Sequence, residues 1–218
     1  MSQRILVWDI PTRLFHWTLV LSFAGAFLTS ETERYRDLHL VLGYLMLGLI
    51  VFRLIWGLIG TRYARFSSFL FSPRATLDYV KSLLQGHPSH YLGHNPAGAV
   101  AILLLLALGL LICLSGVALD LEFMGEMFEE SHETLAYAML TVVFLHIAGV
   151  VVSSRLHGEN LVRAMLTGYK SGTPEQGIAR PFAWLGGIMA LIIAAGLMLY
   201  QPVNSAANGV TTTQHIDD

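Results

Sequence analysis

The stretch His132-Glu-Thr-Leu-Ala-Tyr-Ala-Met-Leu-Thr-Val-Val-Phe-Leu-His146 is the part of the sequence that decides the fold. Two histidines bracket an apolar run, and they are 14 positions apart. On an α-helix this spacing places both rings on one face, roughly 21 Å from each other. His146 lies deep in the apolar run, where a polar ring is costly and is usually functional. The stretch therefore predicts a membrane-spanning helix that carries two functional histidines.

The composition extends this prediction to the whole chain. Of the 218 residues 54% are hydrophobic and only 13% are charged, and the charged share is about half of that in a soluble domain. The apolar residues come in blocks of about the 17–25 residues that cross a bilayer. The five blocks cover residues 14–30, 39–60, 97–119, 134–154 and 181–200. The predicted fold class is an all-α integral membrane protein with a four-helix transmembrane bundle and a fifth, C-terminal transmembrane helix.

We divide the chain into three parts on this pattern. Residues 1–175 form the transmembrane domain, residues 176–200 an additional transmembrane helix, and residues 201–218 a polar tail. The single cysteine, Cys113, lies inside an apolar block, which excludes a disulfide or an iron–sulfur cluster held by one chain. The membrane lipid bilayer is an expected partner, and nucleic acid is not.

The basic residues predict the orientation of the chain in the membrane. Ten Lys and Arg residues fall in the N-terminal segment and in the two connections 61–96 and 155–180, whereas only Arg34 and Arg36 fall on the other side. The excess marks the cytoplasmic side. We therefore expect a multi-pass protein of a bacterial inner membrane, with a cytoplasmic N-terminus and a periplasmic C-terminal tail. A cleaved signal peptide is the rival interpretation of the first block, but its removal would discard His16.

Two further histidines match the first two in depth. His16 lies about six residues, or roughly 9 Å, inside the first helix from the cytoplasm, and His146 lies at a comparable depth. His39 and His132 both lie near the outer ends of their helices. Depth therefore pairs His16 with His146 and His39 with His132. Two facing neutral imidazoles in a helical bundle are typical axial ligands of haem iron, so we expect two haems and a haem-binding bundle.

Arginines supply candidate partners for the carboxylates of a haem. Arg53 interrupts the second apolar block 14 residues after His39, so it shares the face of that histidine and lies near the inner pair. Arginine binds carboxylates well, although the side chain could instead extend to the cytoplasmic surface. Further candidates are Arg13 and Arg155 at the inner side and Arg34 and Arg36 at the outer side.

The connections between the spans carry weaker signals. Residues 73–84 have a pattern suited to a helix lying flat at the interface, and Asn95 with Pro96 resembles a helix start. The outer segment 120–133 holds six carboxylates and neither Lys nor Arg. The negative field of these carboxylates could steer a basic partner toward this side. The alternative is that the segment is simply a solvated loop. His94 and His157 border the cytoplasmic face and are candidates for proton transfer. Solvation is expected for the remaining histidines, which are His87, His90 and His215.

Four short motifs, taken together, resemble those of a known family. They are Arg13-Leu-Phe-His-Trp17, His39-Leu-Val-Leu-Gly-Tyr44, Gly93-His-Asn-Pro96 and His157-Gly-Glu-Asn-Leu161. Over residues 5–172 the chain is similar to the bacterial cytochrome b561 family, which includes the b-type cytochrome subunits of nickel–iron hydrogenases. The resemblance implies a four-helix core with two b-type haems. Its axial ligands would be the histidines that depth also selects, namely His16, His39, His132 and His146.

The resemblance also implies a function. Members exchange electrons with quinone and with partners such as a periplasmic c-type cytochrome or a hydrogenase or dehydrogenase subunit. Histidine at both axial positions leaves no open site on iron, so we expect electron transport and assign no catalytic side chain. One alternative is a stand-alone oxidoreductase that oxidises superoxide or a small reductant with quinone. Another is a transporter of haem or of a metal that uses the histidines as transient sites.

Overall fold

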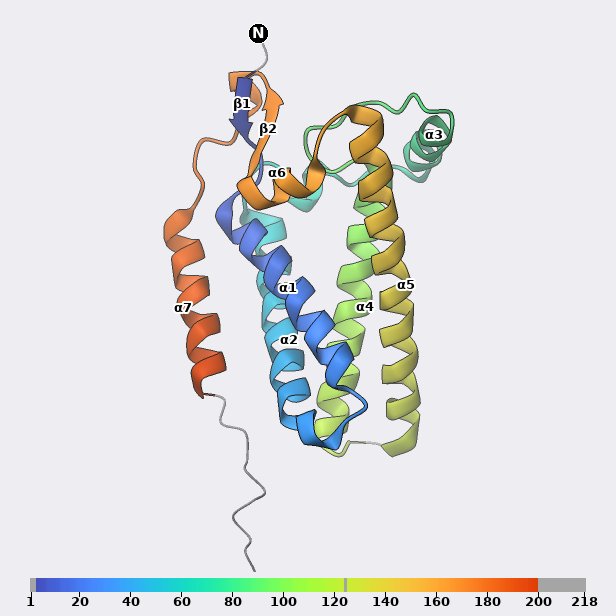
Figure 1. Ribbon diagram of the computed structural model, residues 1–218, viewed down its shortest axis with the longest axis vertical. Coiled ribbons are helices and arrows are strands. Elements are labelled where there is room, and N and C mark those ends of the chain that lie inside the picture. The colour runs from blue at the N-terminus through green and yellow to red at the C-terminus, as the bar shows by residue number, and fades with distance from the viewer. Residues whose placement is uncertain (1–2, 124, 200–218) are drawn as a thin grey trace, which may run out of the picture.

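Four long helices run along a common axis and pack side by side (Figure 1). They are α1 (Ile10–Thr29), α2 (Arg36–Ile59), α4 (Pro96–Asp120) and α5 (Gly125–His157). The structure is a computed structural model that describes residues 3–123 and 125–199. Helix α1 packs against α2, α2 against α4, and α4 against α5, whereas α1 and α5 make little contact over the described residues.

Three of these helices have the length and the hydropathy of membrane spans. They cover Glu33–Ile59, Pro96–Asp120 and Met127–His157. The prediction of a mostly helical, multi-pass membrane protein is thus confirmed. Helix α1 contains Arg13 and His16 and is more polar, and α7 (Ala183–Leu199) is a shorter apolar helix of 17 residues. A fourth and a fifth membrane span therefore stay predictions.

The helix starts follow the local sequence. The Asn95 side chain accepts a hydrogen bond from the amide of Gly98 at 2.7 Å, and Pro96 occupies the first turn of α4, as predicted. Ser72 caps α3 (Pro73–Leu84) in the same way by accepting from Ala75 at 3.2 Å. Proline suits a first turn because the amide it lacks would have no partner within the helix.

The all-α prediction is wrong in one part of the chain. Strand β1 (Gln3–Leu6) pairs antiparallel with β2 (Tyr169–Gly172). The short helix α6 (Leu161–Thr167) precedes β2 and ends at Gly168, whose φ of 90° favours glycine. The remaining short elements are three 3-10 turns, η1 (Glu33–Tyr35), η2 (Phe66–Ser68) and η3 (Pro174–Gln176). A strand of four residues is too short to show a clear alternation of apolar and polar side chains in the sequence. Its formation depends instead on contacts between distant segments of the chain.

A buried carboxylate joins the start of α1 to the end of α2. Asp9 is fully buried, and its Oδ1 accepts the amide of Thr12 at 2.7 Å. Its Oδ2 accepts from Trp56 Nε1 at 3.2 Å and from Thr61 Oγ1 at 2.5 Å. A buried charge needs such partners because it has lost its hydration. The network fixes how α1 enters the bundle.

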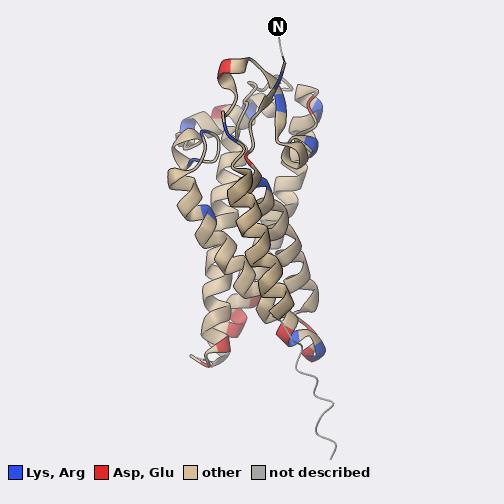
Figure 2. Ribbon diagram, turned by 90° about the vertical axis from the view of Figure 1, so that its left-hand side faces the viewer, with Lys and Arg blue, Asp and Glu red and all other residues tan. Residues whose placement is uncertain are grey.

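Lys and Arg predominate at one end of the bundle, and Asp and Glu at the other (Figure 2). We call the end that carries β1, β2 and α3 the basic end, and the opposite end, at the turn between α4 and α5, the acidic end. The exposed carboxylates described at that turn include Glu122, Glu129 and Glu130. The side chain of Glu126 and the predicted tail 201–218, with His215, lie outside the described residues.

An apolar layer fills the middle of the bundle. Phe23 of α1, Met46 and Ile50 of α2, Ile112 of α4 and Met139 of α5 form one buried cluster. Met139 is seven residues from both His132 and His146. The two predicted histidine pairs therefore lie on opposite sides of this layer.

Substitution of Asp9 by Ala should destabilise the protein by about 2 kcal/mol or more, because a helix cap and two buried donors lose a charged acceptor. The thermal unfolding of the detergent-solubilised protein measures this effect. Ser72→Ala, which removes the exposed cap of α3, is the matched control and should cost about 1 kcal/mol or less. Equal losses from the two substitutions would contradict the role given to Asp9.

Candidate functional site

Two histidine rings face each other at the acidic end. The ring centroids of His39 on α2 and His132 on α5 are 6.1 Å apart, with an angle of 68° between the planes. A metal ion bonded to a nitrogen of each ring at about 2.0 Å would place the centroids roughly 6 Å apart. The observed separation therefore fits two imidazoles on opposite sides of one ion.

Both rings at the acidic end are oriented through Nδ1. His39 Nδ1 lies 2.8 Å from the carbonyl oxygen of Ala26. His132 Nδ1 lies 3.1 Å from the carbonyl oxygen of Ile112 and 2.9 Å from Ser115 Oγ. A ring that donates Nδ1–H to a carbonyl presents the lone pair of Nε2. Histidines that bind metals nearly always use their second nitrogen in this way.

Glycines provide room beside this pair. A Cβ at Gly116 of α4 would lie 3.1 Å from Cε1 of His132, so a larger residue would press on the ring. A Cβ at Gly43, one turn from His39, would meet nothing within 4 Å. Small residues let helices or a flat ligand approach closely. The space beside His39 is therefore open to a planar group.

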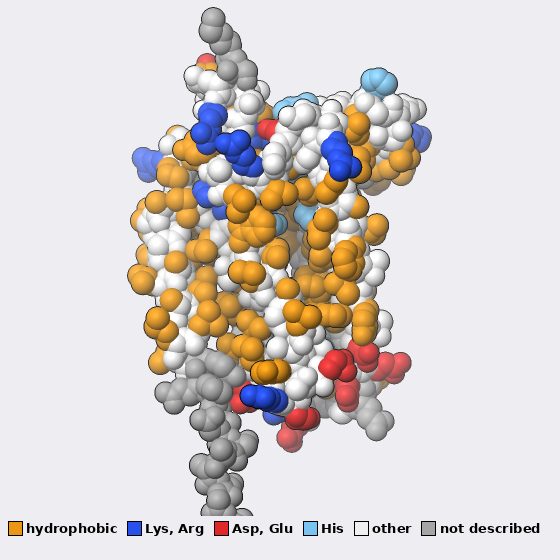
Figure 3. Space-filling model, in the orientation of Figure 1, with side chains coloured by type: hydrophobic (Ala, Val, Ile, Leu, Met, Phe, Trp, Pro, Cys, Tyr) orange, Lys and Arg blue, Asp and Glu red, His pale blue; other side chains and the backbone are white. Residues whose placement is uncertain are grey.

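The second predicted pair, His16 of α1 and His146 of α5, lies toward the basic end. His16 contacts Trp17 edge to face, with the ring centroids 4.9 Å apart. Figure 3 shows histidine side chains recessed in a hollow between the helices toward the basic end. Helices α1 and α5, which carry these two histidines, make little contact with each other over the described residues.

Arg53 is buried near the end of α2. Its side chain is 3% exposed, and its guanidinium lies over the rings of Phe66 and Phe69, at 5.0 and 6.0 Å from their centroids. The side chain therefore does not extend to the surface, which was the alternative. No carboxylate among the described residues forms an ion pair with it, and Nη1 has no hydrogen-bond partner there. The attraction of the nearby Asp9 carboxylate offsets part of the cost of burying this cation. A buried cation without a close ion pair is still costly, so this site favours an anionic ligand.

Other polar atoms near Arg53 also lack partners. Within the described part of the chain, the buried side-chain atoms without a hydrogen bond belong to Thr12, Arg13, His16, Arg53, Tyr79 and His94. All of these residues lie in the first turns of α1, the last turns of α2, in α3 or just before α4, toward the basic end. Buried polar groups are normally satisfied. Their concentration indicates a polar ligand at this end of the bundle.

His94 lies between this group and two aromatic rings. Its ring centroid is 4.7 Å from that of Trp8 and 4.5 Å from that of Phe69. Burial lowers the pKa of His94 to about 3, and the positive charge of Arg53 adds to the effect. The ring is therefore neutral at physiological pH. The Gly93-His-Asn-Pro96 motif had marked this position, but not its contacts.

The remaining predicted arginines have different surroundings. Arg13 donates to the carbonyl oxygen of Leu166 in α6, and its Nε has no partner among the described residues. Arg155 is exposed at the end of α5, and Arg34 and Arg36 are exposed at the acidic end. Of the predicted arginines, Arg53 and Arg13 therefore have buried donors available.

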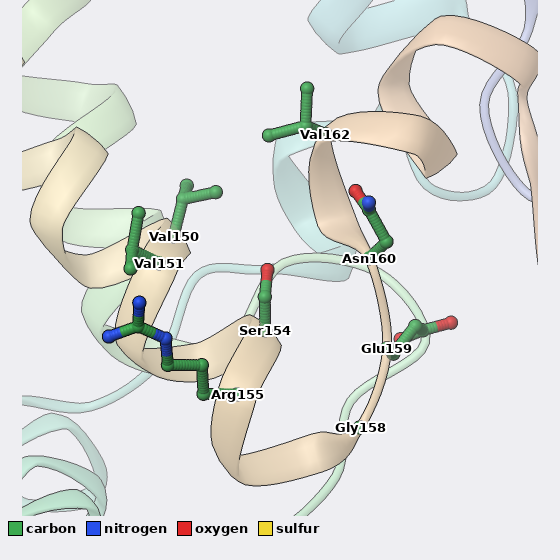
Figure 4. Close-up of a pocket in the computed structure, with 8 residues that line it drawn as sticks. All are labelled: Val150, Val151, Ser154, Arg155, Gly158, Glu159, Asn160 and Val162. Carbon is green, nitrogen blue, oxygen red and sulfur yellow. The ribbon is translucent and has the colours of Figure 1, made fainter.

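An open pocket of about 330 Å³ lies where α5 meets α6 (Figure 4). It combines apolar residues with polar ones, and its lining is Val150, Val151, Ser154, Arg155, Gly158, Glu159, Asn160 and Val162. The Ser154 hydroxyl points between the valines of α5 and the start of α6. Val150 follows His146 by one helical turn. The pocket is therefore next to the pair at the basic end and has the size of a small-ligand site.

The described residues contain no group of three or more His, Cys, Asp or Glu side chains suited to a bare metal ion. A bare transition-metal ion typically takes three or four protein ligands. Paired histidines suit a metal whose other ligands come from a macrocycle, as in haem.

Comparisons with known proteins agree with this chemistry. Residues 7–168 match the family described as prokaryotic cytochrome b561. A probable Ni/Fe-hydrogenase B-type cytochrome subunit of Rhodobacter capsulatus is 22% identical over 77% of this chain and 81% of its own length. Its counterpart in Rhizobium leguminosarum bv. viciae is 23% identical over 76% of this chain and 88% of its own length. No solved structure matches the chain significantly.

The pKa of His94 gives a pH dependence of stability. The unfolded chain binds this proton near pH 6.5 and the folded protein only near pH 3. Between these values the unfolded state holds more protons, so the free energy of unfolding should fall as the pH drops, by up to about 1.4 kcal/mol per unit. Unfolding measured from pH 7 to pH 5 should show a shallower fall for His94→Gln. An unchanged slope would contradict this; His87→Gln, in the exposed loop, is the control.

Proposed function

This chain belongs to the prokaryotic cytochrome b561 family, and we propose that it is a dihaem cytochrome that carries electrons between a periplasmic redox partner and membrane quinone. The family makes it a b-type cytochrome of the membrane that works in electron transfer. The observation that best supports haem ligation is the His39–His132 pair, with its 6.1 Å separation and oriented Nδ1 atoms. The second pair, His16 and His146, lies on the other side of the apolar layer.

The residues of the chain have separate roles in this proposal. His39 and His132 hold the outer haem, and His16 and His146 hold the inner one. Arg53 binds a propionate of the inner haem, because its buried guanidinium forms no ion pair with the described residues and its Nη1 has no hydrogen-bond partner there. Arg13 is a second donor to the propionates. Arg155, which is exposed, is a weaker candidate.

When bound, haem supplies a reversible one-electron exchange at its iron. Two histidine ligands leave no open position, which restricts the site to electron transfer. The apolar layer around Met46, Ile50 and Met139 excludes water between the two sites. The protein thus contributes ligands, orientation and a dry interior.

The quinone site in this proposal is the pocket at the α5–α6 junction. The basic end faces the cytoplasm, as the positive-inside rule requires, so the pocket lies at the cytoplasmic boundary of the bilayer. Its valines suit the apolar part of a quinone ring, while Ser154 and Asn160 can donate to the quinone oxygens. Its lining begins one turn from His146, which places the quinone close to the inner haem.

The electron partner docks at the acidic end. The relatives are hydrogenase cytochrome subunits by name, and a hydrogenase-like subunit or a periplasmic c-type cytochrome would suit this chain. The exposed carboxylates beside His132 give that end a negative field, which attracts a basic surface. The outer haem would then be the first or the last carrier on the periplasmic side.

Replacement of single ligands should remove one haem at a time. The wild-type protein should contain two b-type haems per chain by the pyridine haemochrome assay. His146→Ala should remove the inner haem, and His39→Ala the outer one, so that each variant keeps about one haem with a different spectrum and midpoint potential. Loss of the same component in both variants would contradict the pairing, as would tight binding of carbon monoxide to the reduced wild type.

The acidic end should make electron exchange sensitive to salt. Electron exchange with a basic redox protein should slow as ionic strength rises, because salt screens the attraction between surface charges beyond about 8 Å at physiological ionic strength. Glu129→Gln combined with Glu130→Gln should cause the same slowing at low salt, with both haems retained. Glu175→Gln, at the basic end, should have no effect. Stopped-flow rates that change neither with ionic strength nor with the double substitution would show that docking uses another surface.

A further inference from the structure

A group of titratable side chains lies at the basic end, apart from the histidine pairs. His90 Nε2 is 3.4 Å from Glu159 Oε2, and the ring centroids of His90 and His157 are 5.3 Å apart. His157 Nδ1 lies 2.9 Å from the carbonyl oxygen of Ser153. The His90 side chain is about half exposed, whereas that of Glu159 is 18% exposed. The group therefore leads from the solvent into the protein.

Lys170 of β2 fixes the inner side of this group. Its side chain is 2% exposed, and Nζ lies 2.9 Å from Glu159 Oε2. The same Nζ donates to the carbonyl oxygens of Tyr91 and Leu92 at 3.3 and 3.1 Å. These bonds hold the carboxylate of Glu159 against the loop that precedes His94. A buried lysine in this setting is a positioning residue and leaves the second oxygen of Glu159 available.

A small cavity of about 30 Å³ adjoins the group. That volume holds about one or two water molecules. The cavity is lined by Tyr79, His90, Tyr91, Gly93, Asn95, Ser153, His157, Glu159, Leu161 and Lys170. The hydroxyl of Tyr79, on a side chain that is 5% exposed, has no hydrogen-bond partner among the described residues. An ordered water in the cavity would satisfy it.

Glu159 connects this cavity to the quinone-sized pocket. It is part of the lining of both spaces, and Asn160 and Ser154 continue the polar wall of the larger one. Figure 4 shows the Glu159 side chain on the opposite side of its loop from the valines of α5. Glu159 therefore adjoins both the cavity beside the two histidines and the pocket near His146.

We propose that His90, His157 and Glu159 form a proton entry that supplies the quinone pocket from the cytoplasm. This inference rests on the proposed function. Reduction of one quinone takes two electrons, which come from the two reduced haems, and two protons, and it yields quinol. Oxidation of quinol releases the same protons along the reverse route. The protons enter at His90 and His157 and pass through Glu159 and the water cavity.

The residue types suit this task. Histidine is the side chain whose ordinary pKa lies nearest to neutral pH, so it both accepts and releases protons under physiological conditions. The charged and titratable groups around His90 and His157 are Glu159 and Lys170 from the segment after α5, Tyr79 from α3, and Tyr91 from the loop before α4.

The test compares two oxidants on the full-length protein with both haems bound, in liposomes. The reduced protein is mixed with a short-chain ubiquinone or with ferricyanide, which takes electrons without protons, and haem reoxidation is followed. His90→Gln combined with His157→Gln should lower the ratio of the quinone rate to the ferricyanide rate about tenfold at pH 8. The ratio should recover with added imidazole, and the haem potentials should not change. His87→Gln, in the same loop, should leave the ratio as in the wild type.

The outcomes separate this inference from the proposed function. If quinone fails to reoxidise the wild-type protein while ferricyanide succeeds, the proposed function is wrong. If quinone reoxidises the wild type and the double variant keeps the wild-type ratio from pH 6 to pH 9, the proton entry is wrong. Because both rates are read on one preparation, partial loss of folded protein cancels in the ratio. Glu159→Gln, whose amide oxygen can still accept from Lys170, should lower the ratio as well.

Discussion

The hydrocarbon interior of the membrane requires a partner for each polar group that enters it, and this requirement organises the molecule. Four long helices satisfy the backbone within themselves. Polar side chains in the bundle need partners as well, and His39 and His132 each place a polar ring there. Carbonyl oxygens of Ala26 and Ile112 accept hydrogen bonds from their Nδ1 atoms, which leaves the second nitrogen of each ring free of these bonds. The proposed haem satisfies these nitrogens.

The basic end solves the same problem differently. Asp9 has three donors within the protein and fixes the entry of α1 against the end of α2. It thereby positions His16 relative to Arg53, which forms no ion pair with the described residues. The strands β1 and β2 and helix α6 hold this arrangement from outside. A carboxylate whose hydrogen bonds are satisfied therefore lies near buried donors without partners, which suit an anionic ligand.

The long helices and the depths of the histidines could be predicted from the sequence, because hydropathy and the distance of a residue from a helix end depend only on the order of residues along the chain. Apolar blocks gave the long helices to within a few residues, except at the start of α5, and Asn95 with Pro96 marked the start of α4. The spacing of His132 and His146 placed them on one helix face. The burial of Arg53 could not be decided this way, since a long side chain can reach either the surface or the interior. Arg53 contacts Phe66 and Phe69 because the connection after α2 folds back against that helix. Likewise, His90 looked like a solvated loop residue until Glu159 and Lys170 were brought beside it by distant segments.

The central claim is that the two histidine pairs each hold one haem iron, on either side of the apolar layer. Anomalous X-ray diffraction at the iron absorption edge, on crystals of the purified protein, tests it most directly. The account predicts two iron peaks per chain, one between His39 and His132 and one between His16 and His146, separated along the bundle by roughly the 21 Å rise of 14 helical residues. A single iron peak, or a peak bound to other side chains, would contradict it.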